Sequence, residues 1–512
     1  MPRGDPPLEY ALDQQKAPLV EAVARHVGSG YTAFHVPGHK GWRTALPGLG
    51  DLLGERVALA DLSEVGDLDD LQWPCGAIEE AQMLAAVAFG ADEAFFLVNG
   101  VTCGIQAAIA ACASGGGRVV IPRNVHRSVI GALALADADP VYVVPEVDPS
   151  TGIAGGLPAS TLERALDQSP RARAVLLVHP TYYGVAGDIR ELVKVAHLRG
   201  IPVILDEAHG AHFAFHPALP PAGMHCGADV CVAGCHKTAG AFTQAAVMMV
   251  RGSLVDRDLL RACLRTLQTT SPSYLLMASL DASRRLMATR GMELLGGALA
   301  LSEEVRDRIN DLAVFKCPGD EWTGRPGFFE LDRTKLTVVA PGGGDCRKIE
   351  RELRERFGIV IEFSAPGHFL AVMSYADDAG TAGRLAAALE ALALEQCKAG
   401  GGIDRGGRLC EDRGAHASIV PHVPEQAVSL RRALFSPSEW RDLGRSGGAV
   451  SADTVAAYPP GIPALCPGEA VDEETIEILQ ASFRGGLHVH GIRVSGDRVQ
   501  IRVLRENPSR RE

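Results

Sequence analysis

The chain has 512 residues, of which 46% are hydrophobic and 22% are charged, and its formal net charge is −12. This length allows more than one hydrophobic core, and the composition is typical of globular domains rather than of a disordered chain. The negative charge argues against a nucleic-acid partner, because phosphate binding needs a concentrated basic surface.

The first thirty residues contain several prolines and acidic residues instead of a basic start followed by an apolar run, so we predict no signal peptide. The longest apolar stretches fall short of the roughly 18 residues that a spanning helix needs, which predicts no membrane partner. Twelve cysteines without a CxxC pair are typical of reduced thiols. We therefore expect a cytoplasmic protein.

Between Glu79 and Val250, apolar β-branched runs alternate with Ala- and Leu-rich stretches of helical period. This alternation predicts an α/β fold whose mainly parallel sheet is covered by helices on both faces. Predicted helices include Thr102 to Ala113, Ser160 to Asp167 and Ile189 to Leu198. The predicted strands are Ala94 to Val98, Arg118 to Ile121, Val141 to Val144, Ala174 to Val178, Pro202 to Leu205 and Val230 to Ala233.

The second half of the chain predicts smaller units. After a helical region from Tyr274 to Asn310, strands near Leu336 to Val339 and Ile359 to Glu362 indicate a small α+β domain. A Gly- and Arg-rich linker precedes a C-terminal α+β unit, with a helix around Ser436 to Arg445 and strands from Leu487 to Leu504. The predicted divisions are an N-terminal arm at 1–60, a large domain at 61–290, a small domain at 291–397, a linker at 398–414 and a C-terminal domain at 415–512.

In open α/β sheets, the loops at the carboxyl ends of the strands form the ligand crevice. Here those loops are rich in polar residues, which concentrates the candidate chemistry at one edge of the sheet. The loops are Asn99 to Thr102, Arg123 to His126, His179 to Tyr183, Asp206 to His209 and Cys235 to Thr238.

Two of these loops carry the residues that pyridoxal phosphate (PLP) requires: a lysine that forms a Schiff base, and a carboxylate that keeps the pyridine nitrogen protonated. Lys237 follows the predicted strand Val230 to Ala233, and Asp206 follows the predicted strand Pro202 to Leu205. Burial beside a cation lowers the pKa of a lysine and favours the neutral amine that attacks carbonyls. The alternatives are a surface lysine and an aspartate that caps a helix.

Two further loops supply an anion site and a flat ring. The turn that contains Gly100, Val101 and Thr102 lies between a strand and an Ala-rich helix, so its backbone amides and the helix N-terminus are suited to a phosphate. His126 is a candidate for stacking on the pyridine ring. A Gly-rich turn and a lone histidine are each weak signals, and His126 is equally consistent with an ordinary loop histidine.

A cluster of histidines and cysteines raises a metal site as a rival hypothesis. Its spacing does not match the usual zinc patterns, and the two nearest histidines are three residues apart in a segment interrupted by glycine. We therefore predict no metal. The cluster consists of His209, His212, His216, His225, Cys226, Cys231, Cys235 and His236.

Taken together, the motifs resemble the Orn/Lys/Arg decarboxylases, a family with the aspartate-aminotransferase-type fold, in its short form. The resemblance covers most of the chain and rests on several long motifs in the same order. They are Phe34 to Gly41, Asp61 to Gly76, Phe96 to Gly104, Arg123 to Ser128, Asp206 to His212, His236 to Thr238, Gln268 to Asp281, Tyr458 to Pro463 and Pro467 to Glu469.

The resemblance implies a role for each matching residue. Lys237 would carry PLP, Asp206 would pair with the pyridinium nitrogen and His126 would stack on the ring. His209 would lie near the hydroxyl of the cofactor or on the carboxylate side, and Thr102 with its neighbouring amides would bind the phosphate. The remaining implied roles are an approach of Ser271 and Ser273 to a phosphate across a dimer interface, and a contact of Glu469 with the distal cation of the substrate.

One departure from the family pattern lies beside the lysine. Family members usually carry Ser-Thr before His-Lys, whereas this chain has Gly234 and Cys235, which removes a hydroxyl expected near the phosphate. Val101 and Cys103 likewise replace smaller or hydroxyl-bearing residues in the phosphate turn. These changes affect cofactor affinity and substrate choice more than the use of PLP.

The resemblance implies PLP-dependent decarboxylation of a basic L-amino acid, which is arginine, lysine or ornithine, in a homodimer or larger homo-oligomer with its active site at the interface. After the carboxylate leaves, Lys237 or His236 would protonate Cα. Two alternatives remain: another PLP-dependent conversion, such as transamination, and a non-catalytic regulatory homologue.

Overall fold

The computed structural model describes residues 12–42, 46–312, 314–340, 346–398, 422–458, 461–496 and 498–505. Almost all of the predicted linker therefore lies outside the described residues, as do Pro459 and Pro460 of one family motif.

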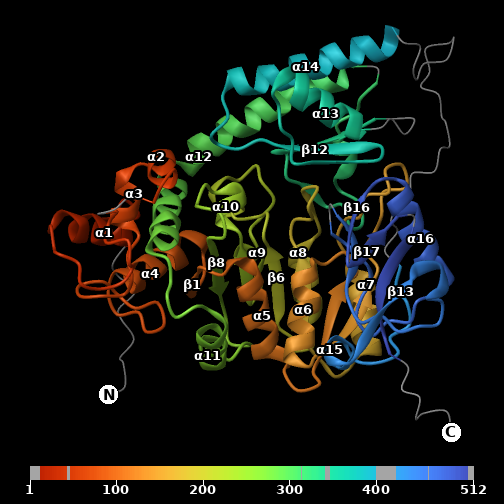
Figure 1. The fold of residues 1–512 in the computed structure, drawn as a ribbon, viewed down its shortest axis with the longest axis horizontal. Coiled ribbons are helices and arrows are strands. Elements are labelled where there is room, and N and C mark those ends of the chain that lie inside the picture. The colour runs from red at the N-terminus through yellow and green to blue at the C-terminus, as the bar shows by residue number, and fades with distance from the viewer. Residues whose placement is uncertain are drawn as a thin grey trace.

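A seven-stranded sheet forms the centre of the molecule, in the order β1-β8-β7-β6-β4-β2-β3 (Figure 1). Strands β3, β2, β4, β6 and β7 pair in parallel, and β8 pairs antiparallel with both β7 and β1. The predicted, mainly parallel sheet is thus confirmed. Its strands are β1 (Glu93–Leu97), β2 (Arg118–Pro122), β3 (Asp139–Val143), β4 (Ala172–Val178), β6 (Val203–Glu207), β7 (Val230–Ala233) and β8 (Ala246–Val250).

Alternate residues of the strands are buried on opposite faces of this sheet, which is why the strands read as continuous apolar runs. Val203 and Leu205 belong to one core cluster, whereas Ile204 between them belongs to the other. Helices α5 (Gly100–Ala113), α6 (Arg127–Ala136) and α11 (Arg257–Leu267) cover the second face. The first face is covered by α4 (Ala77–Phe89), α7 (Ala159–Gln168), α8 (Ile189–His197) and α9 (Gly223–Cys226).

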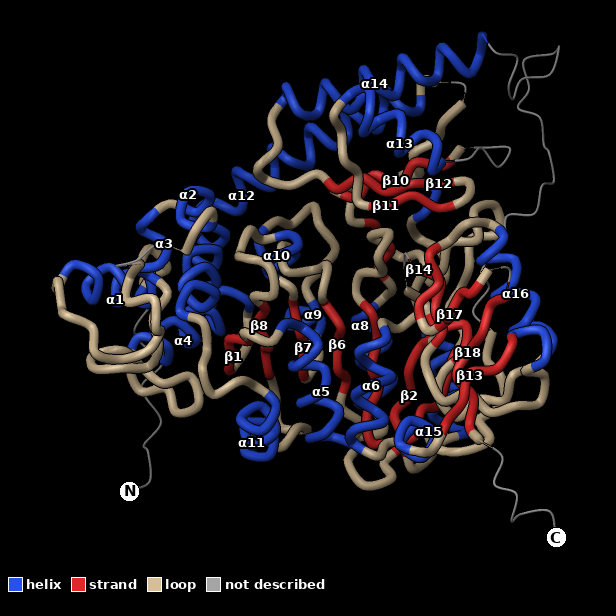
Figure 2. The backbone as a smooth tube through the Cα atoms, viewed as in Figure 1, coloured by secondary structure: helices blue, strands red, loops and turns tan. Residues whose placement is uncertain are grey.

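Helix α12 (Tyr274–Asn310) runs from the large domain into the small domain (Figure 2). Its first half packs in the large-domain core, and its last turns, through Val305 and Ile309, pack in the core of the small domain. That domain contains an antiparallel sheet in the order β10-β12-β11. Its elements are β10 (Lys335–Val339), β11 (Phe363–Ala365), β12 (His368–Val372), α13 (Cys346–Phe357) and α14 (Ala379–Lys398), and β9 (Glu330–Leu331) pairs with β5 (Val185–Ala186) of the large domain.

The C-terminal unit has two three-stranded sheets, β13-β18-β17 and β15-β14-β16, and lies beside α6, against which its residues Leu430 and Cys466 pack. Its strand-rich end is confirmed. Its elements are α15 (Leu430–Phe435), β13 (Ser438–Asp442), β14 (Val455–Tyr458), β15 (Pro463–Leu465), α16 (Glu473–Arg484), β16 (His488–His490), β17 (Ile492–Ser495) and β18 (Arg498–Leu504).

Two predicted elements are wrong. The helix expected around Ser436 to Arg445 is instead strand β13, because its backbone pairs with β18 from Leu504 to Gln500, followed by one 3-10 turn. The strand expected at Ile359 to Glu362 begins only at Phe363, where pairing with β12 starts. In both places, contacts with distant strands override the local pattern.

The N-terminal segment forms α1 (Pro18–Gly28), α2 (Leu49–Leu53) and α3 (Glu55–Ala60). The backbone N–H of Leu19 donates to Asp281 of α12 at 2.9 Å, which ties α1 to the large domain. Among the described residues, no helix is long and apolar enough to cross a membrane.

Candidate active site

A cavity of about 260 Å³ opens at the carboxyl ends of the central strands. Most of the residues singled out in the sequence line this single space. They are Gly100, Val101, Thr102, His126, Asp206, His209, His236 and Lys237. The rest of the wall includes Asn124, Ser128, Tyr182, Tyr183, Tyr458 and Ile462.

Lys237 reaches the cavity from the short helix α10 (Cys235–Thr238), which directly follows β7. Its Nζ lies 3.0 Å from Nε2 of His209. Burial lowers the pKa of Lys237, although the negative charges of Asp206 and Glu362 oppose this shift. A lysine whose pKa is lowered supplies the neutral amine that attacks a carbonyl.

Asp206 and His126 line the same cavity as Lys237. Asp206 is the last residue but one of strand β6 and accepts a hydrogen bond from the N–H of Ala208 at 3.1 Å. Burial raises the pKa of Asp206, against the opposing effect of His126 and Lys237. Burial lowers the pKa of His126, which favours a neutral imidazole, and Nδ1 accepts from the N–H of Ser128 at 3.2 Å.

The N-terminus of α5 forms one end of the cavity. Gly100 has a φ of 75°, in the left-handed region that favours glycine, and starts a helix of 14 residues. No side chain caps this helix, since the Asn99 side chain accepts instead from the N–H of Thr269 at 3.2 Å. The first amides of α5 are therefore available to an anion.

Gly234 has a packing reason to lack a side chain. A Cβ at this position would lie 2.7 Å from the carbonyl oxygen of Ala208, closer than such atoms approach. The Ser of the family pattern therefore does not fit this backbone as it stands, and Cys235 beside it is 4% exposed within the large-domain core.

His209 was singled out in the sequence, but Lys335, which contacts it, was not. Lys335 is 2% exposed, and its Nζ lies 3.1 Å from Nδ1 of His209. Tyr458 and Ile462 of the C-terminal unit also line the cavity, and their only signal in the sequence is the motif that contains them. Lys335 belongs to a strand of the small domain, so no motif connects it to the other residues.

Three singled-out residues do not line the cavity. Ser273 caps helix α12 by accepting from the N–H of Leu276, and Ser271 is exposed. Glu469 is fully buried in a bidentate ion pair with Arg123, with distances of 2.5 and 2.8 Å. Both oxygens of Glu469 are thus engaged away from the cavity.

The histidine and cysteine cluster does not form a metal site in the part of the chain that the structure describes. No group of three or more His, Cys, Asp or Glu side chains lies there as metal ligands would. His236 instead lines the cavity, and its Nδ1 lies 3.1 Å from the carbonyl oxygen of Ala245.

These donors fit PLP. The cavity brings together an amine with a lowered pKa, a buried carboxylate, a neutral imidazole and an uncapped helix N-terminus. These are the four groups that the aldehyde, the pyridine nitrogen, the ring face and the phosphate require.

Solved structures define the fold class. The lysine decarboxylase of Francisella novicida matches this chain with a TM-score of 0.82 at 21% sequence identity. The match covers 96% of this chain and 82% of the decarboxylase chain. The constitutive lysine decarboxylase of E. coli has a TM-score of 0.80 at 22% identity, with the same coverage. The fold is therefore that of these decarboxylases.

Sequence comparisons show the family. The model of the Orn/Lys/Arg decarboxylase major domain matches residues 17–338. An arginine decarboxylase of Bacillus anthracis is 36% identical over 484 residues, covering 94% of this chain and 96% of the relative. An arginine decarboxylase of Bacillus subtilis is 36% identical over 499 residues, covering 97% of this chain and 99% of the relative. The chain belongs to the Orn/Lys/Arg decarboxylase family.

Proposed function

We propose that the protein decarboxylates a basic L-amino acid with PLP as cofactor, and that arginine is the first candidate substrate. The observation that carries the proposal is the meeting of Lys237, Asp206 and His126 around one buried cavity. The names of the relatives at 36% identity support arginine within this class.

Each side chain has a distinct task in this proposal. When bound, PLP accepts the electron pair that the departing carboxylate leaves at Cα. Lys237 would hold the cofactor covalently, Asp206 would keep a proton on the ring nitrogen, and His126 would stack on the ring. The amides at the start of α5 would hold the phosphate.

Proton return to Cα needs a donor inside the cavity. His236 and Lys237 both line it, and burial lowers the pKa of each. Lys237 therefore is the residue that we assign to take and return a proton at Nζ. The apolar and aromatic wall keeps water from the reacting carbon, which favours loss of the carboxylate charge.

We propose Glu362, in place of Glu469, as the carboxylate that meets the distal cation of the substrate. The hydroxyl of Tyr182, in the cavity wall, donates to Glu362 at 2.5 Å. Glu362 is exposed and its charge acts on Lys237, so it lies on the approach to the amine. We assign Glu362 to the guanidinium or ammonium end of the substrate.

We also propose a homodimer or larger homo-oligomer in the cytoplasm. Ser271 lies on the surface outside the cavity of its own chain, which is consistent with a contact in a partner subunit. The cysteines whose side chains the structure describes form no disulfide, which is consistent with a reducing compartment. Mixing Lys237→Ala chains with S271A/S273A chains tests this: recovery of activity in the mixed oligomer supports a shared site, and no recovery contradicts it.

The reaction itself is tested with the pure protein, PLP and arginine, lysine or ornithine in separate assays. Release of carbon dioxide with the matching amine is the expected result, fastest with arginine. Formation of a keto acid would instead indicate transamination. Absence of both products and of visible cofactor absorbance would indicate a non-catalytic homologue.

A further inference from the structure

One short loop of the large domain connects the active-site cavity to the C-terminal unit. The loop runs from Arg123 to His126, between β2 and α6. His126 lines the cavity, whereas the side chain of Arg123 is fully buried in its ion pair with Glu469. Between them, Val125 is 1% exposed and belongs to the same core cluster as Cys466 of the C-terminal unit. The two ends of this loop thus contact two different parts of the molecule.

The C-terminal unit is arranged in the same way, with one end in the cavity wall and the other end at Arg123. Tyr458 is the last residue of β14 and Ile462 directly precedes β15, and both line the cavity. Within β15, the carbonyl oxygen of Ala464 accepts a hydrogen bond from Arg123 at 3.3 Å. Glu469 then accepts from both terminal nitrogens of Arg123, at 2.5 and 2.8 Å. One stretch of chain therefore both lines the cavity and holds Arg123.

Glu469 has little freedom to move. Its carboxylate also accepts from the N–H of Cys466 at 2.7 Å, and its carbonyl oxygen accepts from the N–H of Ser451 at 2.8 Å. Gly468, directly before it, has a φ of 87°, and an added Cβ there would collide with the carbonyl oxygen of Val428. Because a bidentate contact fixes an angle as well as a distance, Arg123 is held in one orientation relative to this segment.

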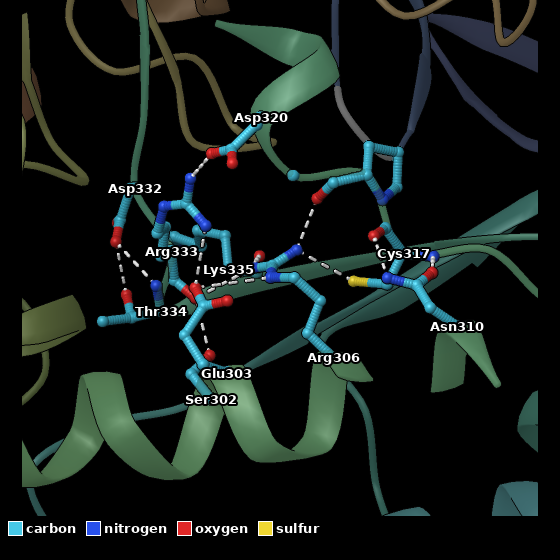
Figure 3. A network of polar contacts seen from close by, with 12 residues as sticks. Ser302, Glu303, Arg306, Asn310, Cys317, Asp320, Asp332, Arg333, Thr334 and Lys335 are labelled. Carbon is cyan, nitrogen blue, oxygen red and sulfur yellow. Dashed lines mark hydrogen bonds and ion pairs between the residues drawn. The ribbon is translucent and has the colours of Figure 1, made fainter. Parts of the chain in front are cut away.

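A second buried arginine shows how such a residue is arranged when it acts within one unit. Arg306 of α12 donates to the carbonyl oxygens of Arg333 at 2.9 Å and of Lys335 at 3.3 Å (Figure 3). Its acidic neighbour Glu303 lies one turn earlier on the same helix, at 3.6 Å. Arg306 and these partners all lie in the small domain. Arg123 differs, because its ion-pair partner belongs to another unit than its own.

We propose that Arg123 and Glu469 are positioning residues for the reaction. Their ion pair holds the cavity wall of the C-terminal unit in a fixed position relative to the loop that carries His126. The two sides of the cavity, at His126 and at Tyr458, then move together. This role replaces the substrate contact that the sequence suggested for Glu469. Its consequence for catalysis rests on the proposed function, because His126 would stack on the cofactor ring.

The first test uses the full-length protein loaded with PLP. Arg123→Lys keeps the charge but replaces the flat, two-pronged contact by a single ammonium group, and Glu469→Gln leaves the guanidinium without a charged partner. In both variants kcat should fall by about ten- to a hundredfold, with a smaller change in KM, because neither residue lines the cavity. The visible circular dichroism band of bound PLP should also change, since it depends on the groups around the ring.

Both variants are compared in protein that is folded at the assay temperature, as shown by its unfolding transition. The control Glu439→Gln breaks a more exposed pair, with Arg441, in the same unit and should leave kcat and the dichroism band unchanged. A pair that only stabilises the protein would leave both readouts unchanged in folded protein. A folded, PLP-loaded Arg123→Lys with the kcat and the band of wild type would therefore overturn the proposal.

The second test needs neither a substitution nor turnover. If the pair couples the two units, a ligand bound at the His126 side must also stabilise the far side, because coupling between sites is reciprocal. Adding PLP to the wild-type protein should slow hydrogen exchange in residues 464–471, which do not line the cavity, by about fivefold or more relative to β13 of the same unit.

An equal change in both segments, or no change in residues 464–471, would overturn the proposal. Failure of the proposed function would appear differently, because wild type would then release no amine from arginine, lysine or ornithine. The exchange response to PLP would still decide the role of the ion pair.

Discussion

The ion pair between Arg123 and Glu469 should hold the C-terminal unit against the central sheet. Both side chains are fully buried, and Glu469 accepts from both terminal nitrogens of Arg123 and from the N–H of Cys466 at 2.7 Å. Arg123 also donates to the carbonyl of Ala464 at 3.3 Å and lies 4.6 Å from the ring centre of Tyr142. Every polar contact of this carboxylate is thus made in a site without water access.

Glu469→Gln keeps the shape of the side chain but leaves the guanidinium charge of Arg123 without its partner. Breaking a buried pair on one side costs about 3–5 kcal/mol. If opening of the C-terminal unit exposes the pair, amide protection in β14 and β15 should fall by about a hundredfold to several thousandfold.

Hydrogen exchange with mass spectrometry measures this effect locally. The matched control is Glu439→Gln in the same unit, whose partner Arg441 lies 2.8 Å away in a pair that is 42% and 25% exposed. That change should cost less than about 1 kcal/mol. Unchanged protection in Glu469→Gln, or equal effects of the two variants, would refute the reasoning.

Three further predictions follow from individual carboxylates. Burial raises the pKa of Glu207 from 4.5 to about 7. The folded state therefore binds this proton more tightly, and the free energy of unfolding should fall by about 3 kcal/mol between pH 4.5 and pH 7. Urea titrations should find Glu207→Gln more stable than wild type at pH 8 but not at pH 4.5, whereas equal differences at both pH values would contradict this linkage. Asp206→Asn cannot keep a proton on the ring nitrogen, so kcat should fall about a hundredfold or more with cofactor still bound, and unchanged kcat would remove Asp206 from the site. Glu362→Gln should raise KM for arginine about tenfold, by loss of about 1.4 kcal/mol of binding, with a smaller effect on kcat; an unchanged KM would place the distal cation elsewhere.

The sequence predicts the central part of the site well because it depends on a local rule. Each buried strand ends in a polar loop, and parallel strands bring their carboxyl ends to one edge, so Asp206 and Lys237 had to lie close together once their strands were recognised. Their strands were found within a few residues of β6 and β7. Strand β8, which separates β7 from β1, was not among the predicted strands, and its antiparallel pairing with both depends on distant contacts that the apolar run does not reveal.

The sequence does not predict those parts of the site and of the fold that depend on contacts between segments far apart in the chain. Lys335 is 126 positions after His209 and contacts it only because the small domain folds next to the large one, so no spacing in the sequence indicates this contact. Glu469 belongs to a family motif, yet its partner Arg123 is 346 residues away in sequence, and this pairing takes its carboxylate out of the cavity. Strand β13 depends in the same way on pairing with β18.

The most direct test of the account compares wild type with Lys237→Ala in a carbon dioxide and amine assay with arginine, lysine and ornithine. Wild type should release carbon dioxide and the matching amine in equal amounts and show a visible absorbance band with PLP, and Lys237→Ala should lose both. A Lys237→Ala protein that kept full turnover and the band would contradict the central claim.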